Sequence, residues 1–209
     1  MGKVQDNKQI KLDALFKSAY DLFMNNGIEK TSIHDIVNKA GVAKGTFYLY
    51  FKDKYDIRDR LIAQTTEKLF MSAYHALLLD QLLYPKFEDK IIFIVDYILD
   101  QLNTNKMILR FIYKNLSWGL FRKAIFNDSL TNEINFMDFY HKMLEENPDV
   151  TLKNPEIMLF TIIELASSTS YSTILDGEPV SYEEMKPYLN ESIRAIIHNH
   201  IISESNFTQ

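Results

Sequence analysis

The chain has 209 residues, of which 46% are hydrophobic, and its formal net charge is −5. This length and composition predict one or two folded domains with a substantial core, and they exclude general disorder. The absence of Cys excludes disulfides, thiolate metal sites and a cysteine nucleophile. Residues 1–9 show no signal segment, and the longest apolar run, at residues 91–99, is too short to span a bilayer, so we expect a cytoplasmic protein without a membrane partner.

The charge is divided unevenly along the chain. The first 60 residues contain eleven Lys and Arg against eight Asp and Glu, whereas the rest contains twelve against twenty. This asymmetry predicts a mildly basic N-terminal part that can approach phosphates and an acidic remainder. Because the basic excess is modest, it predicts few phosphate contacts per subunit and favours binding as a dimer.

Two helices are expected before residue 41. Residues 8–26 carry an apolar stripe at helical spacing, and a second helix is expected at residues 33–40. Ser32 precedes this second helix with Asp35 three residues further on, which is a capping-box pattern. Gly41 follows it, at a position that favours a left-handed backbone.

A third, short helix is expected to begin near Ala43. Phe47 and Phe51, four residues apart, predict its buried side, while its other side presents polar groups. Two helices joined by a Gly-containing turn, the second with polar groups outward, match a helix-turn-helix whose second helix enters the DNA major groove.

The remaining chain predicts further helices and no strand alternation, so the fold class is all-α. A long helix at residues 54–80 is expected because the chain from Gly45 to Tyr84 contains neither Gly nor Pro in between. More helices are expected at about residues 87–102, 105–117, 130–146 and 155–175, with Gly119 as an interruption. A last helix follows a second capping box, with Pro187 marking either a short initial turn or a kink, and the box consists of Ser181 and Glu184.

Residues 27–57, GIEKTSIHDIVNKAGVAKGTFYLYFKDKYDI, resemble the DNA-binding signature of the tetracycline-repressor (TetR) family. The motif similarity covers roughly residues 10–60, and beyond them the likeness is one of length and helical layout. The resemblance implies an N-terminal helix-turn-helix DNA-binding domain at residues 1–53 and a C-terminal helical ligand-binding and dimerisation domain at residues 54–209. It also implies a homodimeric repressor that binds an inverted-repeat operator in double-stranded DNA and is released by a small ligand.

The resemblance places several side chains on DNA. Lys44 would bind phosphate or a guanine edge, and Gly45 would let the backbone approach closely. The third helix lacks the capping Ser that the family often has, because Ala43 stands there. For His34, an ordinary surface histidine is an equally good interpretation. The expected DNA-binding residues are Ser32, His34, Lys44, Gly45, Thr46, Tyr48, Tyr50 and Lys54.

The second part of the chain is rich in aromatic residues, which is typical of pockets for small apolar or aromatic ligands but equally of an ordinary core. Trp118 is favoured because it stands beside Gly119 at an expected helix end. Glu164 lies on an otherwise apolar helix and would face a cationic group, a partner Lys or solvent. The expected ligand-binding residues are Phe93, Tyr97, Met107, Phe111, Tyr113, Trp118, Tyr140 and Glu164, with Phe136 a further aromatic of this set.

The last two helices are amphipathic and resemble the family's dimerisation pair, which packs against its copy as a four-helix bundle. The small polar segment at residues 166–170 favours close packing or a dimer contact over a ligand wall. The expected dimer residues are Leu159, Ile163, Ala166, Ser170, Leu189, Ile193, Ile196 and Ile197.

Two other classes of function compete with a ligand-released repressor. A DNA-binding adaptor of the same fold would engage a protein partner in place of a small molecule, and a large exposed apolar patch would favour it. An enzyme is not expected, because the sequence has no His-Glu-x-x-His pattern, no Gly-rich phosphate loop and no Cys. We therefore expect neither a cofactor nor a bound metal.

Overall fold

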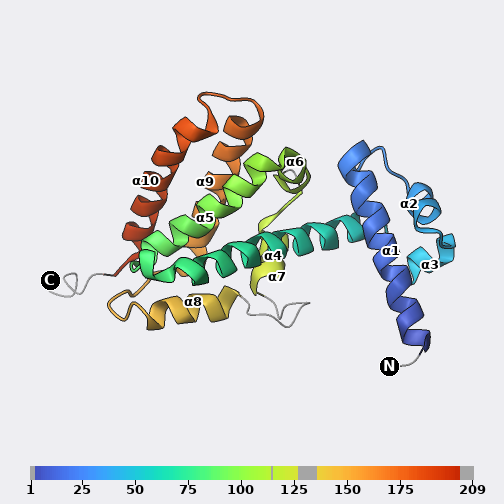
Figure 1. Ribbon diagram of the computed structural model, residues 1–209, viewed down its shortest axis with the longest axis horizontal. Helices are drawn as coiled ribbons and strands as arrows, with labels where there is room; N and C mark the ends of the chain where they lie inside the picture. Colours follow the sequence, from blue (N-terminus) through green and yellow to red (C-terminus); the bar gives the residue numbers. More distant parts are fainter. Residues whose placement is uncertain (1–2, 114, 127–135, 203–209) are drawn as a thin grey trace.

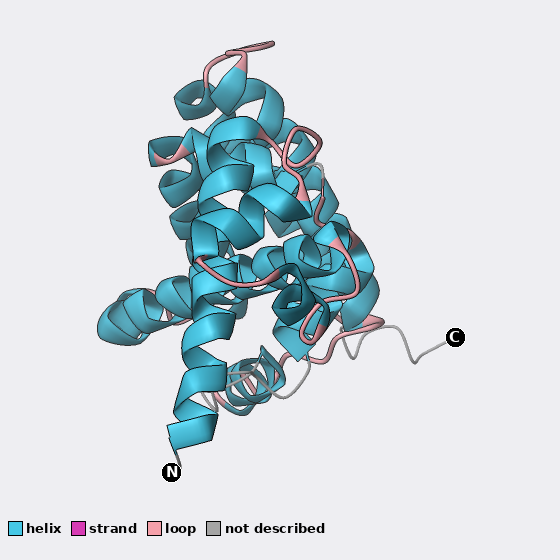
Figure 2. Ribbon diagram, turned by 90° about the vertical axis from the view of Figure 1, so that its right-hand side faces the viewer, coloured by secondary structure: helices cyan, strands magenta, loops and turns pink. Residues whose placement is uncertain are grey.

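A computed structural model describes residues 3–113, 115–126 and 136–202 of the chain. Apart from one isolated bridge between Leu152 and Ile201, the regular structure of these described residues is helical (Figures 1 and 2), which confirms the all-α prediction. The elements are α1 Lys3–Asn26, α2 Ile33–Ala40, α3 Lys44–Tyr48, α4 Lys54–Asp80, the 3₁₀ turn η1 Gln81–Leu83, α5 Phe87–Thr104, α6 Lys106–Tyr113, α7 Trp118–Phe126, α8 Phe136–Glu145, α9 Pro155–Leu175 and α10 Tyr182–His200.

The helices form two groups joined by α4 (Figure 1). Helices α1 to α3 make a small group at one end, which we call the head. Helices α5 to α10 gather around the other part of α4, and we call them the body. In this body α9 packs along α10, and α5 lies against both of them. The head is therefore attached to the body through α4 and through the contact of α1 with α6.

The head is held together by aromatic side chains from its shortest helix and from the residues that follow it. Phe47 and Phe51 are almost fully buried, at 0% and 1% exposure. Phe51 meets Phe16 of α1 edge-on, with ring centroids 5.1 Å apart. Because α3 has only 5 residues, its own hydrogen bonds cannot hold it, and these buried rings fix its position.

Helix α4 is continuous over 27 residues, as the lack of interior Gly and Pro predicts. Ile57 and Ile62 near its start are fully buried, and Tyr74 and Leu77 near its end are buried as well. The helix is therefore anchored by apolar contacts at both ends.

Two predictions of local structure need correction, and one alternative that the sequence left open is decided. The helix expected at residues 105–117 ends earlier, at Tyr113, and α7 then starts at Trp118. Gly119 consequently lies inside α7 and does not interrupt a helix, since one Gly costs a helix only about 1 kcal/mol. Pro187 lies inside α10, so no separate turn precedes that helix. The helix expected from residue 130 is described from Phe136 onward, and its first part lies outside the described residues.

Polar side chains attach α10 to α5. The Tyr182 hydroxyl donates to Asp100 at 2.7 Å, and Lys186 Nζ lies 2.9 Å from both oxygens of the same carboxylate. Asn190 Nδ2 donates to Asp96 at 2.9 Å. Burial raises the pKa of Asp96, and the Asn190 hydrogen bond and Lys186 partly oppose that rise. Burial also raises the pKa of Tyr182, and its bond to Asp100 adds to the rise.

Helix α9 is, among the described helices, the one long and apolar enough in composition to cross a membrane. It nevertheless packs against α5, α6 and α10, with Met158 and Ile162 almost fully buried. Its apolar composition is therefore explained by the interior that it faces.

Replacing Ser181 by Ala should lower the free energy of unfolding by about 1 kcal/mol, because α10 loses its N-terminal cap. In the structure the Ser181 hydroxyl accepts from the Glu184 amide at 3.3 Å, and the Glu184 carboxylate accepts from the Ser181 amide at 3.1 Å. Urea denaturation measures the change. Ser192→Ala on the same helix is the control, since that hydroxyl only returns to a carbonyl one turn back. Equal effects of both substitutions would contradict the capping role.

Candidate nucleic-acid interface and internal cavity

The N-terminus of α2 is fixed by the capping box that the sequence predicts. The Ser32 hydroxyl accepts from the Asp35 amide at 3.2 Å, and the Asp35 carboxylate accepts from the Ser32 amide at 2.9 Å. The hydroxyl also donates to the carboxylate at 2.6 Å. These bonds, from the Ser32 side chain first and its backbone second, lower the pKa of Asp35. Ser32 thus has a structural role at the exposed end of α2.

The turn between α2 and α3 is tight because Gly41 adopts a left-handed backbone with φ of 67°. Its amide donates to the last carbonyls of α2 and closes that helix. Helix α3 then begins at Lys44 after Ala43, which makes no side-chain capping bond, in agreement with the sequence. An added Cβ at Gly45 would meet no atom within 4 Å, so the outer side of this residue is open to an approaching surface.

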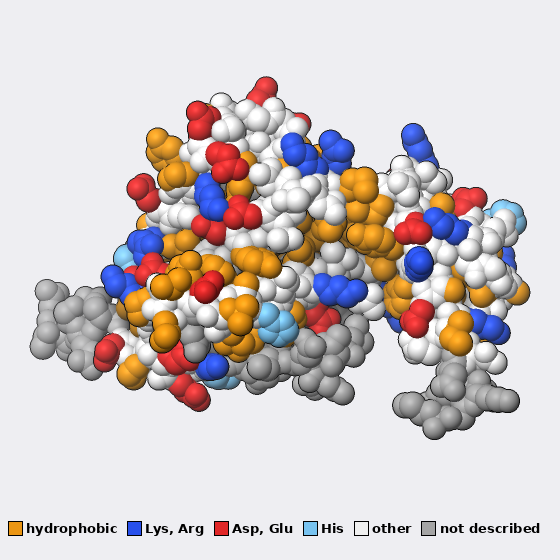
Figure 3. Space-filling view, in the orientation of Figure 1, with side chains coloured by type: hydrophobic (Ala, Val, Ile, Leu, Met, Phe, Trp, Pro, Cys, Tyr) orange, Lys and Arg blue, Asp and Glu red, His pale blue; other side chains and the backbone are white. Residues whose placement is uncertain are grey.

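Helix α3 carries four of the eight expected DNA-binding residues. Lys44 and Gly45 are exposed, and Tyr48 is 52% exposed. Leu49, at the end of the helix, is 80% exposed. Thr46 is half-buried on the same short element. Together they form a surface at the end of the molecule farthest from the body, where Figure 3 also shows Lys and Arg side chains.

Two of the expected DNA-binding residues are engaged within the chain. The Tyr50 hydroxyl donates to the carbonyl of Lys8 in α1 at 3.1 Å. Lys54 Nζ donates to the carbonyls of Ile28, Glu29 and Thr31 at 3.0 to 3.3 Å. The Lys54 ammonium group therefore ties the start of α4 to the loop between α1 and α2.

Other charges of the head remain available. Lys44 and Lys52 are exposed and form no ion pair with any residue that the structure describes, whereas Lys39 pairs with Asp21 at 3.0 Å. His34 is exposed on α2 and lies 3.0 Å from the Asn38 amide nitrogen. Lys44 lies on α3 and Lys52 lies four residues after its end, so both charges are near the expected DNA-binding surface and can approach phosphates.

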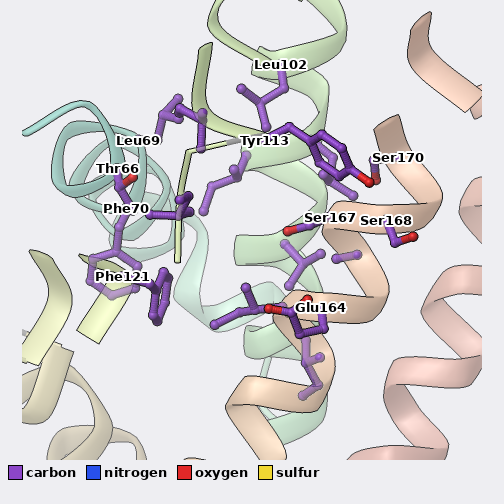
Figure 4. Close-up of a pocket in the computed structure, with 18 of the residues that line it drawn as sticks. Thr66, Leu69, Phe70, Leu102, Tyr113, Phe121, Glu164, Ser167, Ser168 and Ser170 are labelled. Carbon is purple, nitrogen blue, oxygen red and sulfur yellow. The ribbon is translucent and has the colours of Figure 1, made fainter. Parts of the chain in front are cut away.

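The body encloses a cavity of about 460 Å³ between α4, α5, α6, α7 and α9. Most of its wall consists of Leu, Ile, Val and Phe side chains (Figure 4). Its polar lining residues are Thr66, Tyr113, Ser117, Glu164, Ser167, Ser168 and Ser170. A volume of this size with a largely apolar wall and a few polar groups is typical of a site for a small molecule.

The expected ligand-binding residues fall into different places. Tyr113, Trp118 and Glu164 line the cavity. Phe93 and Tyr97 do not, since they line a separate open groove between α5, η1 and α10. Met107 is 48% exposed and Phe111 is packed elsewhere, so neither belongs to the cavity wall. The side chains of Phe136 and Tyr140 lie outside the described residues.

Phe111 connects the body to the head. Its ring lies 6.0 Å from that of Tyr20 and 6.4 Å from that of Phe23, both on α1. Other residues of the same helix, Leu109, Ile112 and Tyr113, line the cavity. Helix α6 therefore contacts the head on one side and the cavity on the other.

The expected dimer residues point inward in the single chain. Leu159, Ile163, Ala166 and Ser170 line the cavity of one chain, and their contact with a second subunit stays a prediction. On α10, Leu189, Ile193 and Ile197 are buried at 0 to 2% exposure and Ile196 is half-buried. These buried side chains belong to the core of one subunit, because α9 and α10 pack against each other and against α5.

The sequence pattern missed exposed apolar residues on the last two helices and two residues of the cavity wall. Ile157, Phe160 and Tyr188 are apolar and 40 to 69% exposed, on the outer sides of α9 and α10. Thr66 and Phe121 line the cavity from α4 and α7. The exposed aromatic residues interrupt an otherwise regular apolar pattern, which is the one signal that would have indicated a second apolar face.

By sequence, known proteins are similar to the head and, at lower identity, to most of the chain. The profile described as "Bacterial regulatory proteins, tetR family" matches residues 15–61. The HTH-type transcriptional regulator YvdT of Bacillus subtilis is 38% identical over 63 residues, which are 28% of this chain and 32% of that protein. An HTH-type transcriptional regulator of Staphylococcus aureus (strain USA300) is 26% identical over 177 residues, covering 82% of this chain and 85% of that protein.

The whole fold has solved counterparts. The FadR repressor of Thermus thermophilus, whose crystal structure holds lauroyl-CoA, superposes with a TM-score of 0.60 at 16% identity. The match covers 94% of this chain and 98% of that one. It shows that head and body together have the same helical arrangement as in that repressor.

Replacing Lys54 by Met should lower the free energy of unfolding by about 1–3 kcal/mol, because three loop carbonyls lose a charged donor. Lys52→Met is the matched control and should stay within about 0.5 kcal/mol, since its side chain makes no bond within the described chain. Thermal or urea denaturation of both variants measures the difference. If Lys54→Met keeps full stability, the ammonium group does not stabilise this loop.

Proposed function

We propose that this chain is a transcriptional regulator of the TetR family that binds DNA through its helix-turn-helix, and that it acts as a homodimeric repressor released from its operator by a small molecule bound in the body. The observation that carries the proposal is α6, which lines the cavity with Leu109, Ile112 and Tyr113 and contacts the head through Phe111. Such a protein acts in the cytoplasm, where its DNA is.

The DNA-binding part of the proposal rests on the exposed side of α3. Lys44 binds phosphate, the open side of Gly45 permits close approach, and Tyr48 donates its hydroxyl to a phosphate oxygen. Thr46, which is half-buried, adds a hydroxyl, and the exposed Leu49 presents an apolar surface to a thymine methyl group. Ser32 and His34 contact the DNA backbone from the N-terminal part of α2. Tyr50 and Lys54 instead stabilise the head through hydrogen bonds within the chain.

Dimerisation uses the outer sides of α9 and α10. Exposed Ile157 on α9 and Tyr188 on α10 supply apolar contacts that a single chain leaves open, and the exposed part of Phe160, whose ring also meets Trp118 edge-on, adds to them. A two-fold dimer through this face presents two heads, which accounts for an inverted-repeat operator.

Release follows from the two sides of α6. A ligand that fills the cavity contacts Leu109, Ile112 and Tyr113, and any shift of α6 is passed by Phe111 to Tyr20 and Phe23 of α1. The ligand weakens operator binding only to the extent that it prefers the shifted arrangement. The relation to the Thermus thermophilus FadR repressor, which holds lauroyl-CoA, supports a body that takes an effector.

A second candidate is an adaptor that engages a protein partner. The end of α4 and η1 expose Leu79, Leu82 and Leu83 at 88%, 92% and 72%. Such a cluster favours protein contact. In this case DNA binding would be independent of the cavity, and filling the cavity by mutation would leave operator affinity unchanged.

Selection of bound fragments from genomic DNA tests the DNA-binding surface. Wild-type protein should enrich a short inverted repeat, and Tyr48→Ala should abolish that enrichment. Enrichment of the same fragments by both proteins would show that α3 is not the recognition helix.

On the selected operator, Lys44→Met should weaken binding and reduce the salt slope of log K by about 1 for each phosphate that the protein no longer neutralises. Binding is measured by fluorescence anisotropy at several salt concentrations. Lys153→Met, an exposed lysine between α8 and α9 in the body, is the control and should leave the slope unchanged. An unchanged slope for Lys44→Met would exclude a phosphate contact by this side chain.

Filling the cavity should imitate a ligand. Ser167→Phe adds a ring to the cavity wall and should weaken operator binding by roughly 5- to 150-fold, the range of typical allosteric coupling. Adding Phe111→Leu, which removes the ring between Tyr20 and Phe23, should recover part of that affinity. Circular dichroism confirms that each variant is folded. If a folded Ser167→Phe binds the operator as wild type does, the cavity does not control the head and the adaptor function is favoured.

A further inference from the structure

The wall of the cavity carries very little charge. Glu164 is the single charged side chain among the described residues that line it, and no Lys, Arg or His of that described set is present. Glu164 forms neither a hydrogen bond nor an ion pair within the described part of the chain, and it lies beside the other lining side chains in Figure 4. The residue is also open to solvent, which places it at the rim of the cavity.

Two buried hydroxyl groups of the wall lack partners. Thr66 on α4 is 8% exposed and Ser170 on α9 is 1% exposed, and the side-chain oxygen of each has no hydrogen-bond partner in the described part of the chain. By contrast, Thr169 next to Ser170 donates to the Leu165 carbonyl at 2.7 Å. A buried hydroxyl without a partner costs free energy, so these groups are positions that a polar atom of a ligand or a water would satisfy.

Aromatic rings complete the chemistry of the site. Tyr113, Trp118 and Phe121 line the cavity, and the Trp118 and Phe121 rings are stacked with centroids 5.4 Å apart. The faces of such rings carry partial negative charge and attract cations. The rings that line the cavity therefore favour a positive group over a negative one.

We propose that the cavity takes an apolar molecule with one positively charged group, such as a long-chain or aromatic ammonium compound, with Glu164 as its counter-ion. The inference rests on the proposed function, in which the cavity holds the effector. The apolar part lies among Leu69, Phe70 and Ile112, and the ammonium group lies at the rim near Glu164. An anionic ligand of the same shape would place its charge near the carboxylate of Glu164, and this repulsion would weaken its binding relative to a cation.

Three probes of equal chain length test the charge preference: decylammonium, decanol and decanoate at pH 7. Trp118 is the one tryptophan of the chain and lines the cavity, so its fluorescence reports occupancy directly. We expect decylammonium to bind most tightly, decanol less tightly and decanoate most weakly.

Glu164→Gln separates charge from shape. This variant should lower the preference for decylammonium over decanol by about fivefold, in line with a solvent-accessible ion pair. Glu145→Gln is the matched control, because it removes an exposed carboxylate of α8 outside the cavity and changes the net charge equally. Its preference should equal that of wild type.

The outcomes distinguish this inference from the proposed function. If decanol or decanoate binds as tightly as decylammonium, or if Glu164→Gln keeps the full preference, the charge assignment is overturned while the cavity remains a ligand site. If none of the three probes changes Trp118 fluorescence, the cavity takes no such ligand and both proposals fall. If saturating decylammonium occupies the cavity and leaves operator binding unchanged, the charge preference stands and release by the ligand is overturned.

Discussion

The structure depends on one helix that is shared by both parts of the molecule. At 1.5 Å per residue, the 27 residues of α4 span about 40 Å. Its first turns are buried in the head through Ile57, its middle lines the cavity through Thr66, Leu69 and Phe70, and its end packs in the body through Leu77. Because a continuous helix bends little, a displacement of its middle is carried to its start.

A second contact joins the head to the body in addition to α4. Phe111 of α6 packs against Tyr20 and Phe23 of α1, so the head is attached to the body at two separate places. If α6 and α4 keep their relative position, the head has one orientation. If a ligand between them changes that position, the two attachments no longer fit the same orientation and the head must turn. In a dimer, a turn of each head changes the distance between the two recognition helices, to which binding at successive major grooves is sensitive.

The head was predictable because its signals are local. Ser32 and Asp35 cap a helix from three residues apart, Gly41 adopts the left-handed conformation that the turn needs, and Phe47 and Phe51 face inward at helical spacing. Each of these features is decided by residues within a few positions of one another. Lys54 shows the limit of such reasoning, since its partners lie more than twenty residues earlier in the chain. A first-turn lysine therefore suggested phosphate, while the fold directs it to loop carbonyls.

The body was less predictable because periodicity identifies an apolar face but not what lies opposite. On α9 the same pattern is compatible with a core, a cavity or a partner subunit. This helix uses inward residues for the cavity, exposes Ile157, and places the partly exposed Phe160 against Trp118. The aromatic residues of α5 and α6 posed the same problem, since Phe93 faces a groove and Phe111 faces the head. Their places are fixed by helix packing, which depends on residues far apart in the sequence.

The hydroxyl groups of α9 show how one helix separates two tasks. Thr169 and Thr173 donate to carbonyls one turn back, at 2.7 and 2.9 Å, so their hydroxyl groups are satisfied within the helix. Ser170 lies between them, is almost fully buried and has no partner for its hydroxyl in the described part of the chain. An unmet hydroxyl beside an unfilled volume lowers stability by about 1–3 kcal/mol in the free protein. A ligand that satisfies it regains this free energy on binding, so the same hydroxyl group that weakens the free protein favours the bound one.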